Sequence, residues 1–260
     1  MATPSSADQR PKAAAEKATT DDAFLDGRVR VAQPRRGFRA GLDAVMLAAA
    51  VPARTGDSVC DLGAGVATAA LCLAARVAGL HITVVEIDEG LAALARANGG
   101  RNAHAKSFST VVADILKRPR SLRRQGFDHV LTNPPFHEIA RGTRAPDGMK
   151  AQATSARASE LVAWLRFARA LVRPKGTVTA ILPPEQVALA LAALSPSGVG
   201  IEIVPLWPKL GAPAKRVIIR MRTNSKAPTV LLAGLVLHEA DGTPTLAAQT
   251  VLRHAHALST

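Results

Sequence analysis

The chain has 260 residues, of which 48% are hydrophobic and 20% charged, and its formal net charge at pH 7 is +13. This hydrophobic fraction is enough for a sizeable core, which excludes a wholly disordered protein. So positive a charge favours a polyanionic partner, because Lys and Arg release counterions when they bind phosphates. A bias towards Ala and Arg on a solvated surface would give the same charge, so composition alone leaves both interpretations open.

Several features indicate a cytoplasmic protein. The N-terminal residues lack the apolar segment of a signal peptide, and no run approaches the roughly 18 apolar residues of a membrane-spanning helix. Cys60 and Cys72 stand in apolar surroundings, which predicts two buried thiols and no disulfide. The histidines show no spacing typical of metal ligands, so we expect no metal and no membrane contact.

The N-terminal part of the chain precedes the regular pattern. Residues 1–22 are rich in Ala, Ser, Thr, Lys and Asp without periodicity, which predicts a disordered basic arm. Residues 24–32 alternate around Asp26-Gly27, which predicts a short hairpin. Residues 41–51 form a predicted helix that begins near Asp43.

The centre of the chain alternates strands and helices, a pattern typical of an α/β, doubly wound, mostly parallel sheet. The predicted strands span residues 58–62, 82–87, 109–113, 127–132, 177–182, 201–204 and 217–221. The predicted helices span residues 66–77, 88–98, 157–171 and 185–194. We also predict a mobile loop over residues 137–156, a further strand over residues 230–237 and a helix in the last residues. We therefore predict one domain over residues 23–260.

A candidate cofactor site lies where the first of these strands turns into a helix, at Asp61-Leu62-Gly63-Ala64-Gly65. Gly63 and Gly65 let the backbone approach a ligand closely, at the carboxyl edge of the sheet. A dinucleotide-binding turn would carry a third glycine where this chain has Thr68. The carboxylate of Asp61 would repel a pyrophosphate, but it suits the ammonium group at the methionine end of S-adenosylmethionine.

Two further carboxylates end the following strands. Glu86 lies about 20 residues beyond the turn, where a carboxylate can accept hydrogen bonds from both ribose hydroxyls of an adenosine. Asp114 closes the third strand and is a candidate partner for the adenine amine, although a plain helix cap would also explain it. Asp88 is predicted to be the N-cap of the second helix.

The tetrapeptide Asn133-Pro134-Pro135-Phe136 follows the fourth strand and predicts chemistry on an amine. The prolines fix the backbone and remove two amide donors. The side-chain oxygen of Asn133 and the carbonyl of Pro134 can then both accept hydrogen bonds from one NH2 group and aim its lone pair at an electrophilic methyl group. Phe136 offers a face on which a flipped base can stack. A chance Pro-Pro turn is the alternative interpretation.

The chain resembles the class I S-adenosylmethionine-dependent amino-methyltransferases in the order of four features: DLGAG, VVEID, the strand end at Asp114 and NPPF. The segments that flank them over residues 24–255 are similar to those of the tRNA(Val) adenine-N6-methyltransferase family: GFRAGLDAVMLAA, RGTRAPDGMKAQATS, PKGTVTAILPPE, GAPAKR and GLVLHEADGTPT. One departure is Val66-Ala67-Thr68 after the glycines, where relatives often carry Ser-Gly or Thr-Gly.

The resemblance implies a Rossmann-like methyltransferase sheet of seven strands with an antiparallel strand at one edge. It divides the domain into a cofactor-covering segment at 23–55, a core at 56–222 and a C-terminal extension at 223–260. It also makes Arg39 and Asp43, with Asn133, candidate contacts to S-adenosylmethionine or to the target base. A capped surface helix is the alternative for Arg39 and Asp43.

The activity that the resemblance implies is methylation of the exocyclic N6 amine of adenine in RNA, with tRNA as the expected partner. NPPF also occurs in enzymes that methylate a glutamine amide, so a release-factor-like protein, another structured RNA or DNA remain alternatives. A noncatalytic RNA-binding module would not need intact Asp61, Glu86 and Asn133. Whether the protein is a monomer or a homodimer stays undecided.

Basic residues in the loops predicted at the reactive face are the candidate RNA contacts: Arg141, Arg144, Lys215 and Arg216. Such side chains would follow RNA phosphates around an extruded base. A denser basic run over residues 117–124 lies between the third and fourth strands, and we rank it below these four. Each basic residue taken alone is also explained as a solvated surface charge.

Overall fold

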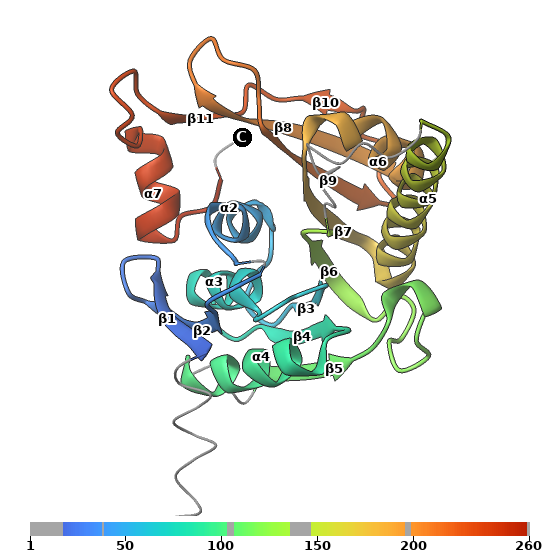
Figure 1. Cartoon of the computed structure of the whole chain (residues 1–260), viewed down its shortest axis with the longest axis horizontal. Helices are drawn as coiled ribbons and strands as arrows, with labels where there is room; N and C mark the ends of the chain where they lie inside the picture. Colours follow the sequence, from blue (N-terminus) through green and yellow to red (C-terminus); the bar gives the residue numbers. More distant parts are fainter. Residues whose placement is uncertain (1–17, 38, 103–106, 136–146, 196–198, 259–260) are drawn as a thin grey trace, which may run out of the picture.

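The computed structural model describes residues 18–37, 39–102, 107–135, 147–195 and 199–258. Nine strands of these residues form one sheet: β3 (Ser58–Leu62), β4 (His81–Glu86), β5 (Phe108–Val112), β6 (Phe127–Thr132), β7 (Val172–Leu182), β8 (Val199–Lys209), β9 (Arg216–Thr223), β10 (Val230–Leu231) and β11 (Leu235–His238). Their order is β10-β8-β9-β7-β6-β3-β4-β5, and β11 also pairs with β8 (Figure 1).

The predicted doubly wound, mostly parallel sheet is confirmed. Strands β5, β4, β3, β6 and β7 pair in parallel, and β9 provides the expected antiparallel pairing by running against both β7 and β8. The sheet has nine strands rather than seven, because residues 230–237 form two short strands along β8. Gly234 separates them at φ +81°, and a Cβ there would lie 2.2 Å from the Pro205 carbonyl oxygen.

Helices cover both faces of the sheet (Figure 1). On one face lie α2 (Leu42–Ala50), α3 (Thr68–Arg76), α4 (Glu89–Arg101) and α7 (Leu246–His254); on the other lie α5 (Asp147–Leu171), α6 (Val187–Leu194) and the 3-10 turns η2 (Ile115–Lys117) and η3 (Pro184–Gln186). Each face buries its own hydrophobic cluster against the strands. No helix within the described ranges is long and apolar enough to cross a membrane.

The predicted helices are present with small shifts at their ends. Asp88 caps α4 as predicted, since its carboxylate accepts a hydrogen bond from the Leu91 N–H at 2.8 Å. The predicted loop is too long, because residues 147–156 already belong to α5, where an Ala-rich sequence favours a helix. Residues 137–146 lie outside the described residues. Cys60 and Cys72 are both buried and unbridged, as expected.

The predicted hairpin consists of β1 (Thr19–Phe24) and β2 (Val29–Pro34), which pair antiparallel. The turn between them places Leu25, Asp26 and Gly27 at positive φ. Residues 19–22 therefore belong to a strand and not to the predicted arm, while residues 1–17 lie outside the described residues. The misprediction has a clear cause, since a strand that pairs at a hydrated edge needs few apolar residues.

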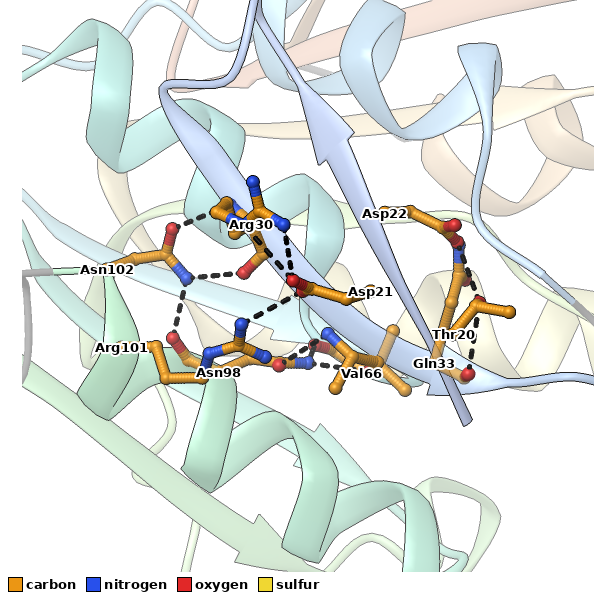
Figure 2. A network of polar contacts seen from close by, with 10 residues as sticks. Thr20, Asp21, Asp22, Arg30, Gln33, Val66, Asn98, Arg101 and Asn102 are labelled. Atoms are coloured by element: carbon orange, nitrogen blue, oxygen red, sulfur yellow. Dashed lines mark hydrogen bonds and ion pairs between the residues drawn. The ribbon is translucent and has the colours of Figure 1, made fainter. Parts of the chain in front are cut away.

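Asn98 in α4 and Asn102, the C-cap residue of this helix, attach β2 to the rest of the molecule (Figure 2). The buried side chain of Asn98 accepts a hydrogen bond from the Ala32 N–H at 2.8 Å and donates to the carbonyls of Ala32 and Val66 at 3.0 and 3.1 Å. One turn later, Asn102 makes the same pair of bonds to the N–H and carbonyl of Arg30 at 3.0 and 2.9 Å. A helix thereby supplies the hydrogen bonds that a neighbouring strand would give to β2.

Replacing Asn98 tests this attachment. Asn98→Ala leaves the half-buried N–H and carbonyl of Ala32 and the buried carbonyl of Val66 without their partner, which should cost about 2–4 kcal/mol of unfolding free energy. The exposed Arg96 on the same helix provides the control, because Arg96→Ala should change the free energy by roughly 0.5 kcal/mol or less. Equal urea midpoints for the two variants would show that the hairpin does not depend on Asn98.

Candidate active site

The candidate site lies where the order of the strands reverses. From β3 the chain runs outward through β4 and β5, and it then returns to β6 on the other side of β3. In open α/β sheets, ligands bind in the crevice that such a reversal leaves at the carboxyl ends of the strands. Leu62 at the end of β3 pairs with Thr132 at the end of β6. The turn after Asp61 and the Asn-Pro-Pro segment therefore begin side by side.

A cavity of about 320 Å³ opens at this point. Its lining includes residues from four separate parts of the chain: Arg39, Asp43, Asp61, Gly63, Thr68, Asn133 and Arg216. The fold thus brings together most of the residues that the sequence suggested for a cofactor. Among the residues that the structure describes, no three His, Cys, Asp or Glu side chains are grouped as metal ligands would be.

Asp61 is the most unusual group of this cavity. Its side chain is only 2% exposed, and Oδ2 has no hydrogen-bond partner within the described part of the chain. Burial, with the charge of Glu86 as a further contribution, raises the pKa of the Asp61 carboxyl to about 7. The neighbouring Thr68 hydroxyl is also buried and unpartnered there. A buried carboxylate of this kind is stabilised by a cationic ligand group.

The glycine turn is held by the neighbouring strand. Gly63 and Ala64 donate their N–H groups to the Val85 carbonyl at 2.9 and 3.0 Å. Gly63 and Gly65 have φ of +69° and +56°, a conformation that favours glycine. A Cβ on Gly63 would lie 2.8 Å from the ring of Trp164, whereas one on Gly65 would meet no atom within 4 Å.

Glu86 and Asp114 are not part of the lining of this cavity. The buried Glu86 carboxylate accepts hydrogen bonds from the N–H groups of Gly65 and Ile87, both at 2.8 Å, and of Asp88 at 3.0 Å. Since a carboxylate offers about four acceptor positions, Glu86 retains room for one further donor. Asp114 caps η2 through the Leu116 N–H at 2.9 Å, which is the alternative role that we considered for it.

The Asn-Pro-Pro segment is anchored through Thr132, the last residue of β6. The buried Thr132 hydroxyl donates to the Leu62 carbonyl at 2.8 Å and accepts the Trp164 indole N–H at 2.9 Å. Asn133 Oδ1 is buried, and no described residue donates a hydrogen bond to it. Pro134 is buried and Pro135 exposed. Phe136 lies outside the described residues.

Sequence reasoning missed the helical wall beside this segment. A second, smaller cavity of about 100 Å³ is lined by Pro134, Pro135, Trp164 and Gln186, among others. Gln186 Oε1 is buried without a hydrogen-bond donor in the part of the chain that is described. The only signals in the sequence were the rarity of Trp, with two in the chain, and the Pro-Pro-Glu-Gln segment that follows β7.

The remaining predicted residues are placed as follows. The Arg39 guanidinium bonds to Thr20 Oγ1 and the Pro34 carbonyl, at 2.8 and 2.9 Å, and pairs with Asp22. Arg216, which we grouped with the RNA contacts, lines the cofactor cavity and donates to Asp43 Oδ2 at 2.8 Å. Lys215 is exposed. Arg141 and Arg144 lie outside the described residues.

Comparisons with known proteins found similar sequences. The family model described as "Methyltransferase small domain" matches residues 40–159. A Shewanella baltica protein named tRNA1(Val) (adenine(37)-N6)-methyltransferase is 30% identical over 70% of this chain and 76% of its own. A Klebsiella pneumoniae protein of the same name is 31% identical over 62% of this chain and 64% of its own.

Solved structures give a consistent result. A predicted O-methyltransferase from Agrobacterium tumefaciens has a TM-score of 0.69 at 26% identity, over 84% of this chain and 98% of its own. TrmN from Thermus thermophilus has a TM-score of 0.52 at 23% identity, over 70% of this chain and 48% of its own. At that identity, the second likeness concerns the fold alone.

The protonation of Asp61 gives a testable pH dependence. Below about pH 7 the free protein holds Asp61 neutral, so an ammonium ligand must bind the minority ionised form. The affinity for S-adenosylmethionine should therefore rise roughly 10-fold per unit between about pH 5.5 and 6.5, and then level off until the ligand's own amine deprotonates near pH 8. Calorimetry at several pH values measures this.

Asp61→Asn is the control for this prediction. It should bind S-adenosylmethionine more weakly at about pH 7.5, and the rise of affinity from acidic to neutral pH should disappear, since Asn does not titrate. A wild-type affinity that is the same at about pH 5.5 and pH 7.5 would contradict the assignment of Asp61 to the ammonium group.

Proposed function

The chain belongs to the S-adenosylmethionine-dependent methyltransferase family whose curated members are named tRNA1(Val) (adenine(37)-N6)-methyltransferase, and on that premise we propose that it methylates the N6 amine of an adenine in tRNA. The single observation that supports an amine as the acceptor is the buried oxygen of Asn133, which follows β6 and receives no hydrogen bond from any described residue. The adenine and the tRNA are inferred from the names of the relatives and from the net charge of +13. With tRNA as the substrate, we expect the enzyme in the cytoplasm.

The residues at the carboxyl edge fit S-adenosylmethionine. We assign Asp61 to its ammonium group, because a buried carboxylate oxygen there has no partner in the described structure. The glycine turn at Gly63 and Gly65 leaves the backbone accessible beside it, and Glu86 keeps one acceptor position for a ribose hydroxyl. Asp114 is the candidate for the adenine amine of the cofactor. When bound, S-adenosylmethionine supplies an electrophilic methyl group on a sulfonium.

The acceptor oxygens of the chain would activate the target amine. The lone pair of an exocyclic amine is delocalised into the base, so the amine is a weak nucleophile. Asn133 Oδ1 and the Pro134 carbonyl can accept hydrogen bonds from its two N–H groups, which favours a pyramidal nitrogen and directs the lone pair. Pro135 keeps the backbone fixed at this point. We expect Phe136 to stack on the flipped base.

The arrangement around Thr132 would keep these acceptors in place. The hydroxyl of Thr132 is bound on one side by β3 and on the other by Trp164, so Asn133 starts from a fixed position. Preorganised acceptors do not have to reorient during the reaction, which is why they lower its barrier. Gln186, with an unpartnered oxygen at the adjoining cavity, is a candidate contact to the edge of the base.

Product analysis tests the substrate. The purified protein, incubated with S-adenosylmethionine and unmodified tRNA transcripts, should yield N6-methyladenosine on nuclease digestion and mass spectrometry. The main alternative is the amide of a protein glutamine, because the same two acceptors serve that nitrogen. Methylation of a release factor with none of tRNA would reject the RNA substrate while leaving the amine mechanism in place.

Variants of Asn133 test the mechanism. Asn133→Ala removes one acceptor for the amine protons and should slow single-turnover methyl transfer about 10²- to 10³-fold at saturating cofactor and RNA. Asn133→Asp retains an acceptor oxygen and should lose less rate than Asn133→Ala. Melting temperatures near that of the wild type would exclude misfolding. A folded Asn133→Ala protein that transfers methyl groups at the wild-type rate would refute the amine-acceptor mechanism.

A further inference from the structure

A broad basic groove lies at the opposite edge of the sheet from the candidate active site. Its volume is about 740 Å³. Its lining includes residues at the start of β7, the start of β8 and the end of β9. All three lie at the amino edge of the parallel strands. Six of its lining residues are arginines: Arg118, Arg120, Arg123, Arg124, Arg166 and Arg169. We refer to these six and the hollow between them as the basic groove.

The arginines of the basic groove are not neutralised by the protein. Its lining contains no Asp or Glu, and within the described residues no ion pair or side-chain hydrogen bond involves any of the six guanidinium groups. Five of them are exposed, and Arg169 is half-buried. Other arginines of this chain, such as Arg173 and Arg220, are paired with carboxylates. Six unpaired cations around one hollow repel each other unless an anion binds there.

The basic groove continues along α5 towards the active site. Arg118 and Arg166 also line a shallow hollow farther along α5, with Ser159, Val162 and other residues. Beyond it, Arg157 lines the small cavity at Pro134 and Pro135. From Arg157 to Arg169 the helix rises by about 18 Å. Arginines therefore lie at several points between the Asn-Pro-Pro segment and the opposite edge of the molecule, and Glu160 lines the small cavity beside Arg157.

We propose that the basic groove binds the phosphate backbone of the RNA substrate at a distance from the nucleotide that is methylated. This inference rests on the proposed function and extends it, because the groove would hold a part of the RNA that does not react. Unpaired arginines bind phosphates strongly, through charge and paired N–H donors. Several of them in a row match a polymer of phosphates rather than a single anion.

The composition of the basic groove favours RNA over an anionic membrane. Surfaces that attach to lipid combine basic residues with exposed apolar side chains that enter the bilayer. None of the exposed large hydrophobic residues of the described structure lines the groove. The groove is also concave, and its lining includes the exposed side chains of Gln125 and Asn224. Such polar groups can donate to phosphate and ribose oxygens.

The test compares two triple variants with the same change in charge. The groove variant carries R120Q, R123Q and R124Q, and the control variant carries R54Q, R96Q and R253Q, three exposed arginines outside the groove. The groove variant should bind unmodified tRNA transcripts roughly 10- to 100-fold more weakly at low salt, and the log–log salt slope should fall by about 2–3. The control variant should stay within about 3-fold of the wild type.

Methyl transfer separates the basic groove from the active site. At saturating tRNA the groove variant should react at the wild-type rate, since its acceptors are intact, and its loss should appear only at low RNA concentration. A short single-stranded oligoribonucleotide with one adenine, which reaches only the active site, should be methylated equally by wild type and groove variant. Equal losses in both triple variants, or unchanged tRNA binding by the groove variant, would overturn the proposal.

Two further outcomes are informative. If the wild type methylates tRNA but the groove variant binds it normally, the inference fails while the proposed function stands. If no methylated adenine forms but tRNA binding still depends on the groove, the proposed function fails and the groove remains an RNA site. Loss of binding to phosphatidylglycerol vesicles in the groove variant, with tRNA binding unchanged, would assign the groove to a membrane and reject the proposal.

Discussion

The hydrogen bonds through Thr132 fix the distance between the two motifs on which the site depends. Its hydroxyl joins the Leu62 carbonyl on β3 to the indole of Trp164 on α5, and the same indole ring packs against Gly63. The turn after Asp61 and the segment that starts at Asn133 are thus held by one aromatic side chain. Trp164 belongs to α5, which covers one face of the sheet, whereas the glycine turn leads into α3 on the other face. Formation of the site therefore requires both helical layers to be in place.

The candidate active site is built around polar atoms that the protein itself leaves unsatisfied. Buried oxygens of Asp61, Thr68, Asn133 and Gln186 lack partners in the described structure, and each such group costs free energy in the absence of a ligand. Seven side chains of the described structure carry such an atom, and these four line the two neighbouring cavities near the ends of β3, β6 and β7. The loss of stability is offset when a ligand with complementary donors binds.

The order of strands and helices was predictable because each element has its own apolar period, and the DLGAG and NPPF motifs fall where strands end. Pairings between distant polar residues were not predictable. Nothing in the spacing of Arg216 and Asp43 indicates that they meet at one cavity. Strand β1 was missed because it is polar. The basic run over residues 117–124 was ranked low because only the loops at the carboxyl edge of the sheet were expected to face the RNA.

The attachment of β2 to α4 has a consequence for chemical ageing. Asn98 is followed by Gly99, and an Asn-Gly pair readily deamidates when the chain is flexible, since the small glycine lets its nitrogen attack the side-chain amide. The protein cannot easily avoid the pair, because a Cβ at residue 99 would lie 2.5 Å from the Phe108 ring, and Asn98 must donate two hydrogen bonds. In the folded state the buried helix protects the amide. Each excursion to the unfolded state exposes it, and conversion to Asp would leave a charge where donors are required, so that heat inactivation becomes irreversible with time.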